Sequence, residues 1–118
     1  MYKIIWLVKF RRGIERDEVL RWWRGHHAEL AAATPGMVRY VQSHWTAPLD
    51  PVTQLPRDGE PAFDGHAEHW FESREAYEAA MESEEWRRVQ EDGPYGFDSA
   101  TLVGGALDET VISWTSDP

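Results

Sequence analysis

Strand-like and helical patterns alternate along this chain in an order that few folds can accommodate. Residues 2–10 form the first strand pattern, and its large apolar side chains point to both sides. Ile4 and Trp6 share one face, and Ile5 and Leu7 share the other. A strand with apolar groups on both faces is expected to lie in the middle of a sheet that is covered on two sides.

The later patterns define the order of the remaining elements. They predict, in chain order, a helix from about residues 15–17 to 34, strands at 37–45 and 66–71, helices at 73–83 and 83–92, and strand-like segments at 100–107 and 109–114. Strand, helix, strand, strand, helix and strand, with an extra C-terminal strand, is the order of the split βαβ, ferredoxin-like arrangement. The sequence therefore predicts an α+β fold with an antiparallel sheet, formed as one domain over residues 1–118.

The sheet of such a fold carries its helices on one face only. The other face must also be hidden from water, because Ile5 and Leu7 point to it. Two copies packed sheet to sheet would hide this face, so we expect a homodimer.

A long connection separates the second and third strand patterns. Residues 46–63 contain four prolines and the turn dipeptide Asp58-Gly59, which predict a loop with at most a short hairpin. Loops of this length inside a compact domain are usually functional or disordered. We therefore expect residues 46–63 to act as a lid over a binding pocket.

Composition excludes several classes of function. The net charge is −9, which argues against nucleic acid and anionic membranes as partners, because both are bound through basic surfaces. No run of about 18 apolar residues exists to span a membrane. The chain has no cysteine, so thiol nucleophiles and cysteine metal ligands are excluded. Without a leader-like first segment, the simplest expectation is a cytoplasmic protein.

One histidine lies on the apolar face of the first predicted helix. Leu20, Trp23, His27, Leu30 and Ala31 recur at spacings of three and four residues, so they share that face. The histidine in this row points at the core. It is either a packed structural residue or a titratable group held in a pocket.

The other histidines do not form a metal-ligand set with one another. His66 and His69 are three residues apart on a predicted strand and therefore point to opposite faces, while His26 and His27 are adjacent on a helix and diverge. His26 is expected at the pocket edge or on the surface. No glycine-rich phosphate loop is present either, so we expect neither a metal nor an organic cofactor.

Three separated segments resemble the EthD family of dimeric α+β barrel proteins. They are Trp23-Arg24-x-x-His27-Ala28, then Pro35-Gly36-Met37-x-x-Tyr40-Val41-Gln42-x-His44, and then Asp64-Gly65-x-Ala67-Glu68-x-Trp70-Phe71-x-Ser73. The resemblance runs from Met1 to about Ser83. The family is named from an ether-degradation gene cluster and is associated with aromatic breakdown and polyketide tailoring. The resemblance implies an α+β barrel formed by two copies, but it does not specify a reaction.

The chain is also similar in layout to methylmuconolactone isomerases. That similarity places the helical histidine of these enzymes at His27, their strand tyrosine at Tyr40, and a strand cysteine at His69. Because histidine replaces the thiol here, the similarity favours proton transfer over thiol chemistry.

Together these observations predict an enzyme for a small aromatic, polyketide-like or lactone carbonyl substrate, acting by isomerisation, cyclisation or dehydration. The expected catalytic residues are His27, His69 and Tyr40, and the expected substrate-binding residues are Trp6, Trp23, His44 and Phe71. The structural alternatives to these roles are that Tyr40 lies in a subunit interface and that a strand histidine is exposed to water at the end of its strand. The functional alternatives are a cofactor-free monooxygenase of phenolic or polyketide substrates and a small-molecule binding protein without catalysis.

Overall fold

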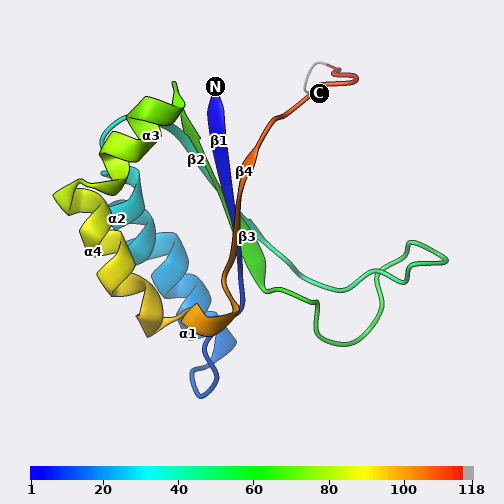
Figure 1. The fold of residues 1–118 in the computed structure, drawn as a ribbon. Helices are drawn as coiled ribbons and strands as arrows, with labels where there is room; N and C mark the ends of the chain where they lie inside the picture. Colours follow the sequence, from blue (N-terminus) through cyan, green and yellow to red (C-terminus); the bar gives the residue numbers. More distant parts are fainter. Residues whose placement is uncertain (116–118) are drawn as a thin grey trace.

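A four-stranded antiparallel sheet carries its helices on one face, as Figure 1 shows for the computed structural model of the chain. The structure describes residues 1–115. Its elements are β1 (Tyr2–Val8), α1 (Arg16–Trp22), a π-helical turn (Trp23–His27), α2 (Ala28–Ala32), β2 (Met37–His44), β3 (Gly65–Phe71), α3 (Arg74–Met81), α4 (Glu84–Asp92), short 3₁₀ turns (Gly93–Tyr95 and Ser99–Thr101) and β4 (Val103–Leu107). The predicted α+β, ferredoxin-like fold is confirmed.

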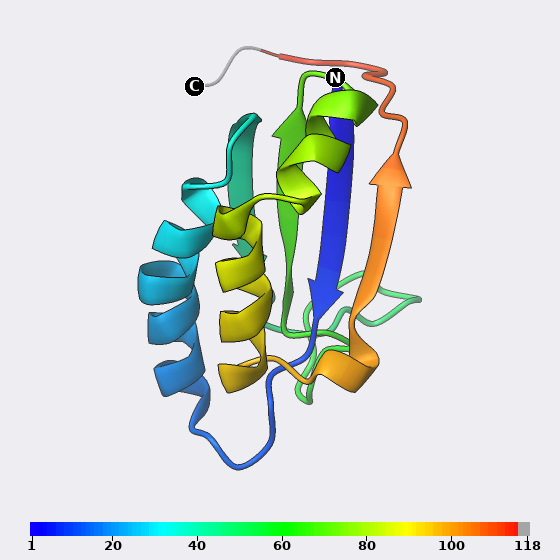
Figure 2. The ribbon, with the colours of Figure 1, turned by 60° about the vertical axis from the view of Figure 1, so that its left-hand side comes forward.

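The strands lie side by side in the order β2-β3-β1-β4, which can be followed across Figure 2. β1 is central, as its two apolar faces predicted, and pairs antiparallel with β3 and β4. Its register sets Ile4 opposite His69 and Trp6 opposite Ala67. Side chains of these four residues therefore share the sheet face that the helices cover.

The first helix forms where it was predicted, but a π-helical turn over Trp23–His27 interrupts it. Asp17 and Glu18 lie in its first turn, where carboxylates interact favourably with the helix dipole. Residues five apart are about 140° apart around a regular α-helix, whereas the wider π turn brings them to the same side. Trp22 is consequently carried next to His27, with ring centroids 4.6 Å apart.

Serine side chains cap the N-termini of α3 and α4. The hydroxyl of Ser73 accepts a hydrogen bond from the N–H of Ala76 at the start of α3. The hydroxyl of Ser83 does the same for Trp86 at the start of α4. These side chains satisfy backbone donors that a helix N-terminus leaves without a partner.

The C-terminal region differs from the prediction. Residues 100–102 do not belong to a strand, because Ser99–Thr101 form a 3₁₀ turn and β4 begins at Val103. The strand predicted at 109–114 is wrong, because residues 108–115 pair with no strand of the described chain. β4 is the sheet edge, and the chain leaves the sheet beyond it (Figure 1). An alternating pattern assigns side chains to faces but does not supply a neighbouring strand to pair with.

Residues 46–63 form a long projection on the side of the sheet opposite the helices (Figure 1). A bridge between Leu49 and Pro56 is its short hairpin-like element. Its base is held by Asp64, whose carboxylate accepts from the guanidinium of Arg16 at 2.6 Å and from the backbone N–H of Phe10 at 2.7 Å. The root of the loop is therefore tied to α1 and to the segment that follows β1.

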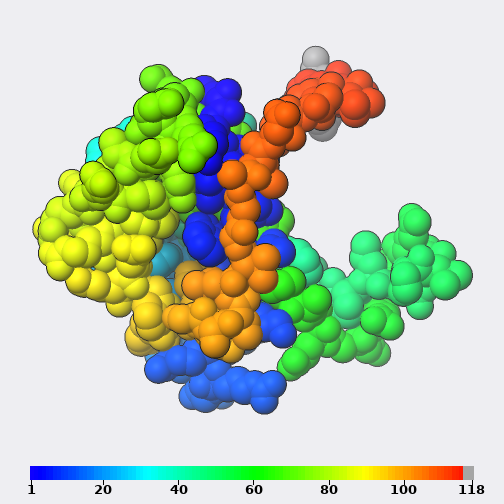
Figure 3. Space-filling view, viewed as in Figure 1, coloured from blue at the N-terminus to red at the C-terminus, as the bar shows by residue number. Residues whose placement is uncertain are grey.

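The open face of the sheet carries both charged and apolar side chains. Lys3 is buried there, and its ammonium group forms ion pairs of 2.5 Å with Glu68 and 2.6 Å with Glu109. Val103 and Leu107 of β4 remain exposed. Figure 3 shows this side as a hollow bounded by residues 46–63 and by the C-terminal segment. The described part of the chain has no helix with the length and hydrophobicity needed to cross a bilayer.

Candidate functional site

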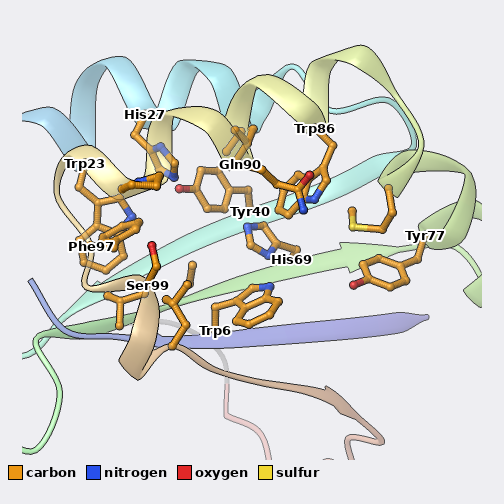
Figure 4. A pocket seen from close by; sticks show the side chains of 18 residues that line it. Trp6, Trp23, His27, Tyr40, His69, Tyr77, Trp86, Gln90, Phe97 and Ser99 are labelled. Carbon is orange, nitrogen blue, oxygen red and sulfur yellow. The ribbon is translucent and has the colours of Figure 1, made fainter.

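A cavity of about 460 Å³ lies between the helical layer and the covered face of the sheet (Figure 4). This volume is within the usual range of small-molecule sites, about 300–1,000 Å³. Its wall is mostly apolar and aromatic. The side chains that matter most below are Trp6, Trp23, His27, Tyr40, His69 and Trp86. The wall thus combines flat hydrophobic surfaces with a small number of polar groups.

His27 is buried at the end of the π turn and points into the cavity in Figure 4. Its Nδ1 lies 2.9 Å from Oδ2 of Asp92, the last residue of α4. The indole N–H of Trp22 donates to the same carboxylate oxygen at 3.0 Å. The ring of His27 is therefore held between a carboxylate and an aromatic neighbour.

The bond to Asp92 also determines which nitrogen of His27 can act as a base. Since a carboxylate oxygen only accepts, Nδ1 carries the hydrogen and Nε2 keeps the lone pair. Burial lowers the pKa of His27 below its usual value, although Asp92 opposes this effect. The ring is consequently neutral at neutral pH and ready to accept a proton at Nε2.

Tyr40 projects from β2 into the same cavity (Figure 4). Its hydroxyl oxygen accepts from the amide of Gln42 at 2.7 Å, and the same amide nitrogen donates to the carbonyl of Trp23 at 2.8 Å. Burial raises the pKa of Tyr40, so the phenol stays protonated at neutral pH. Because Gln42 occupies an acceptor position, the phenolic hydrogen remains available to a ligand.

His69 lies beside Tyr40 on the neighbouring strand β3. The two rings stack with centroids 5.0 Å apart, and Trp86 packs edge-on against His69 at 5.8 Å. Burial, with a smaller contribution from His27, lowers the pKa of His69 to about 4. Within residues 1–115, neither ring nitrogen of His69 has a hydrogen-bond partner. His69 is thus a neutral polar group whose hydrogen bonds a ligand can satisfy.

The lowered pKa of His69 predicts that the protein loses stability in mild acid. The unfolded chain takes up a proton near pH 6.5, while the folded chain does so only near 4. Stability is therefore complete above about pH 6.5 and falls as the pH drops towards 4, by up to about 3 kcal/mol. Denaturant unfolding measured across this range should show a shallower pH dependence for His69→Gln than for the unchanged protein. The same substitution at exposed His26 is the control, and an equal effect of both substitutions would contradict this assignment.

The structure brings most of the sequence-predicted site residues to one cavity and leaves two outside it. His27, His69, Tyr40, Trp6 and Trp23 all line the wall.

His44 and Phe71, which were predicted to bind substrate, do not line the cavity. His44 packs against the ring of Trp23 at 4.9 Å and bonds to Gln42, which places it behind the wall. Phe71 is buried against Tyr77 beneath α3. Both residues share the helix-covered face of the sheet, but they lie too far along their strands to reach the cavity.

The loop does not cover the cavity. No residue of 46–63 lines it, and the loop extends from the opposite side of the sheet. The lid prediction is therefore wrong for the cavity of the same chain. His26 lies on the surface, with its side chain 64% exposed.

Two important contacts of His27 were missed from the sequence. Asp92 is the last residue of α4, where a carboxylate interacts unfavourably with the helix dipole. Its unfavourable position could have indicated that Asp92 interacts with a group outside its own helix. The contact with Trp22 follows from the π turn, and no feature of the 3.6-residue pattern indicates such a turn.

No group of three or more metal-ligating side chains occurs within residues 1–115. His66 and His69 point to opposite faces of β3, as expected from their spacing. His66 accepts from the indole N–H of Trp45 on the open face, and His69 lines the cavity. The polar groups of the cavity are suited to hydrogen bonding and proton transfer.

The family model of the EthD domain matches residues 11–98 of the chain. A search of curated proteins gives no match.

Several solved structures are similar to this chain. An EthD family protein from Bacillus halodurans has a TM-score of 0.74 and 20% identity, covering 93% of this chain and 99% of its own. A dimeric protein of unknown function with a ferredoxin-like fold from Bacteroides fragilis has a TM-score of 0.60 and 14% identity, covering 92% and 95%. A structure described as an antibiotic biosynthesis monooxygenase has a TM-score of 0.59 and 15% identity, covering 94% and 100%. At these identities the likeness concerns the fold.

Proposed function

Since the chain belongs to the EthD domain family, we propose that it is a cofactor-independent enzyme that moves a proton on a small aromatic, polyketide-like or lactone carbonyl compound. The observation that carries this proposal is the pairing of His27 with Asp92 at the wall of an apolar cavity. A neutral imidazole oriented by a carboxylate is a common arrangement for a general base.

The proposed reaction begins with the removal of a proton from the carbon next to the carbonyl group. Nε2 of His27 takes this proton, and the electrons of the C–H bond form an enolate. Tyr40 donates its phenolic hydrogen bond to the oxygen that gains negative charge. Asp92 stabilises the imidazolium that forms on His27, through the bond to Nδ1. The imidazolium then returns the proton to a different carbon, or to a leaving hydroxyl group that departs as water.

The apolar surroundings support this chemistry. Trp6, Trp23 and Trp86 exclude water from the cavity wall, and a hydrogen bond is stronger where water is excluded. His69 contributes a neutral polar group next to Tyr40. We assign it the second contact to the substrate oxygen.

The proposal can be tested without knowing the natural substrate. β-Tetralone is a flat two-ring ketone with exchangeable protons beside its carbonyl group. Proton NMR in D₂O should show that the protein replaces these protons by deuterium faster than the buffer alone does. A protein that binds β-tetralone without accelerating exchange would instead support the alternative of a binding protein without catalysis.

A second candidate function is a cofactor-free monooxygenase of electron-rich phenols. The aromatic wall and the likeness to a structure described as an antibiotic biosynthesis monooxygenase favour it. Dioxygen would then be a co-substrate, with one oxygen atom entering the product and the other leaving as water. Oxygen consumption with a fused-ring hydroquinone would support this reaction, and its absence alongside proton exchange would support the first one.

We also propose that the protein is a homodimer that packs its open sheet faces together. Ile5 and Leu7 are only half-buried on this face of the single chain, and Val103 and Leu107 are exposed. The Bacteroides fragilis protein of similar fold is described as dimeric. Sedimentation equilibrium at micromolar concentration should give twice the chain mass, and a monomer at that concentration would contradict the proposal.

A further inference from the structure

The wall of the cavity carries no charged side chain. Eighteen residues of the described chain line it, and none of them is lysine, arginine, aspartate or glutamate. We propose that the ligand of this cavity is an uncharged, flat compound, and that its outer polar end lies at the cavity mouth against Gln90 or Ser99. This inference rests on the proposed function of the same cavity and adds the charge and orientation of the substrate.

The surroundings of the cavity disfavour an anion in particular. A carboxylate that enters an apolar cavity loses its hydration and requires a cation or several donors in return. The two histidines cannot supply that cation at neutral pH, because burial lowers the pKa of both. Asp92 lies directly behind His27 and would repel a second carboxylate. The net charge of −9 adds a long-range repulsion of the same sign.

The mouth of the cavity supplies polar groups without charge. Gln90 comes from α4 and Ser99 from the 3₁₀ turn before β4, on different sides of the cavity in Figure 4, and both residues are exposed. Within residues 1–115 neither side chain has a hydrogen-bond partner. The amide and the hydroxyl are therefore free to bind a carbonyl or hydroxyl group of a ligand. His27 and Tyr40 at the inner wall would bind the reacting oxygen, so the ligand would have a polar group at each end.

The charge preference can be measured with two probes of almost identical shape. 2-Naphthamide and 2-naphthoate share a fused ring and differ in charge, because an amide replaces the carboxylate. Isothermal titration at neutral pH should show 2-naphthoate binding at least about 30-fold more weakly than 2-naphthamide, because the carboxylate would be desolvated without a partner. Equal affinities for the two probes, or no binding of either, would overturn the proposal.

A designed cation at the mouth provides the reverse test. Leu102 lines the mouth and is 37% exposed, so Leu102→Lys places an ammonium group there with little disturbance of the core. It should strengthen the binding of 2-naphthoate by roughly tenfold relative to the binding of 2-naphthamide by the same variant. Ala100→Lys adds the same charge from the same 3₁₀ turn at an exposed residue outside the wall, and should have little effect. Equal responses of the two variants would place the ligand elsewhere and overturn the assigned orientation.

These binding measurements involve no turnover, so the charge of the ligand and the proposed enzymatic function can be contradicted independently of each other. Charge discrimination without any exchange of β-tetralone protons would remove the enzymatic proposal and keep the uncharged ligand. Exchange that depends on His27, together with equal binding of the two naphthalene probes, would do the opposite.

Discussion

Replacing His27 by alanine should lower the protein-dependent exchange of β-tetralone protons by about 10²- to 10⁴-fold, the usual contribution of a positioned general base. The imidazole supplies the only ring nitrogen in the described cavity wall that is oriented by a carboxylate. The exchange rate per protein molecule, measured by proton NMR in D₂O, checks this prediction. Exchange that survives in His27→Ala would exclude this residue as the base.

The matched control is the adjacent histidine. His26 has the same chemistry, lies one residue earlier in the π turn and exposes 64% of its side chain to water. His26→Ala should leave the exchange rate within about twofold, because an exposed group outside the wall contributes little. Thermal unfolding of both variants separates a lost base from a lost fold. His27→Gln, which keeps most of the volume, is the second variant if His27→Ala is unstable.

The role of Asp92 can be separated from that of His27. In Asp92→Asn the amide can donate to Nδ1, which would move the hydrogen of His27 to Nε2 and block that nitrogen as a base. The exchange rate should fall although His27 is still present, and its pH dependence should change. A positioning role is indicated by that change in the pH profile, since a purely structural loss would lower the rate equally at every pH.

The sequence could predict the side of the sheet that a strand residue occupies. Strand side chains alternate strictly, so His66 and His69 were correctly placed on opposite faces of β3, and the structure shows that the face of His69 is the one covered by the helices. The same rule does not say how far along the strand a cavity extends. Phe71 and His44 consequently lie on the covered face of the sheet but outside the cavity wall.

The helical pattern was informative until the helix departed from its regular period. Trp23, His27 and Ala31 are buried as predicted. The π turn then brings Trp22 towards His27, which a period of 3.6 residues does not allow.

The sequence patterns could not predict contacts between segments that are distant in the chain. Asp92 reaches His27 across 65 residues of the chain, and only the packing of α4 against the first helix creates the pair. The direction of residues 46–63 likewise depends on where the loop leaves the sheet and not on its proline content. Length and composition identified the loop but not the face from which it projects.

Replacing Trp23 by alanine should cost about 3–5 kcal/mol of folding free energy, the usual range for a large buried aromatic residue. Trp23 is 1% exposed and packs edge-on against Phe10 and Phe97, with centroids 5.9 Å and 5.3 Å away. Its ring lies so close to Gly65 that a Cβ atom there would come within 2.9 Å. Because Trp23 also lines the existing cavity, removing its ring would enlarge that cavity and remove the contacts of its neighbours. Chemical denaturation should show this loss of free energy, and thermal unfolding should show a fall in melting temperature of roughly 10–25 °C.

Trp114→Ala removes the same side chain from a position that is 80% exposed in the single chain, and therefore serves as the control. In a monomer it should change the free energy of unfolding by less than about 0.5 kcal/mol. If a second copy covers Trp114, its effect should instead depend on protein concentration, because dimer stability is linked to association. Trp23→Ala should lower the free energy of unfolding at every protein concentration, since this residue is buried within one chain. A Trp23→Ala variant as stable as Trp114→Ala would contradict the central packing role assigned to Trp23.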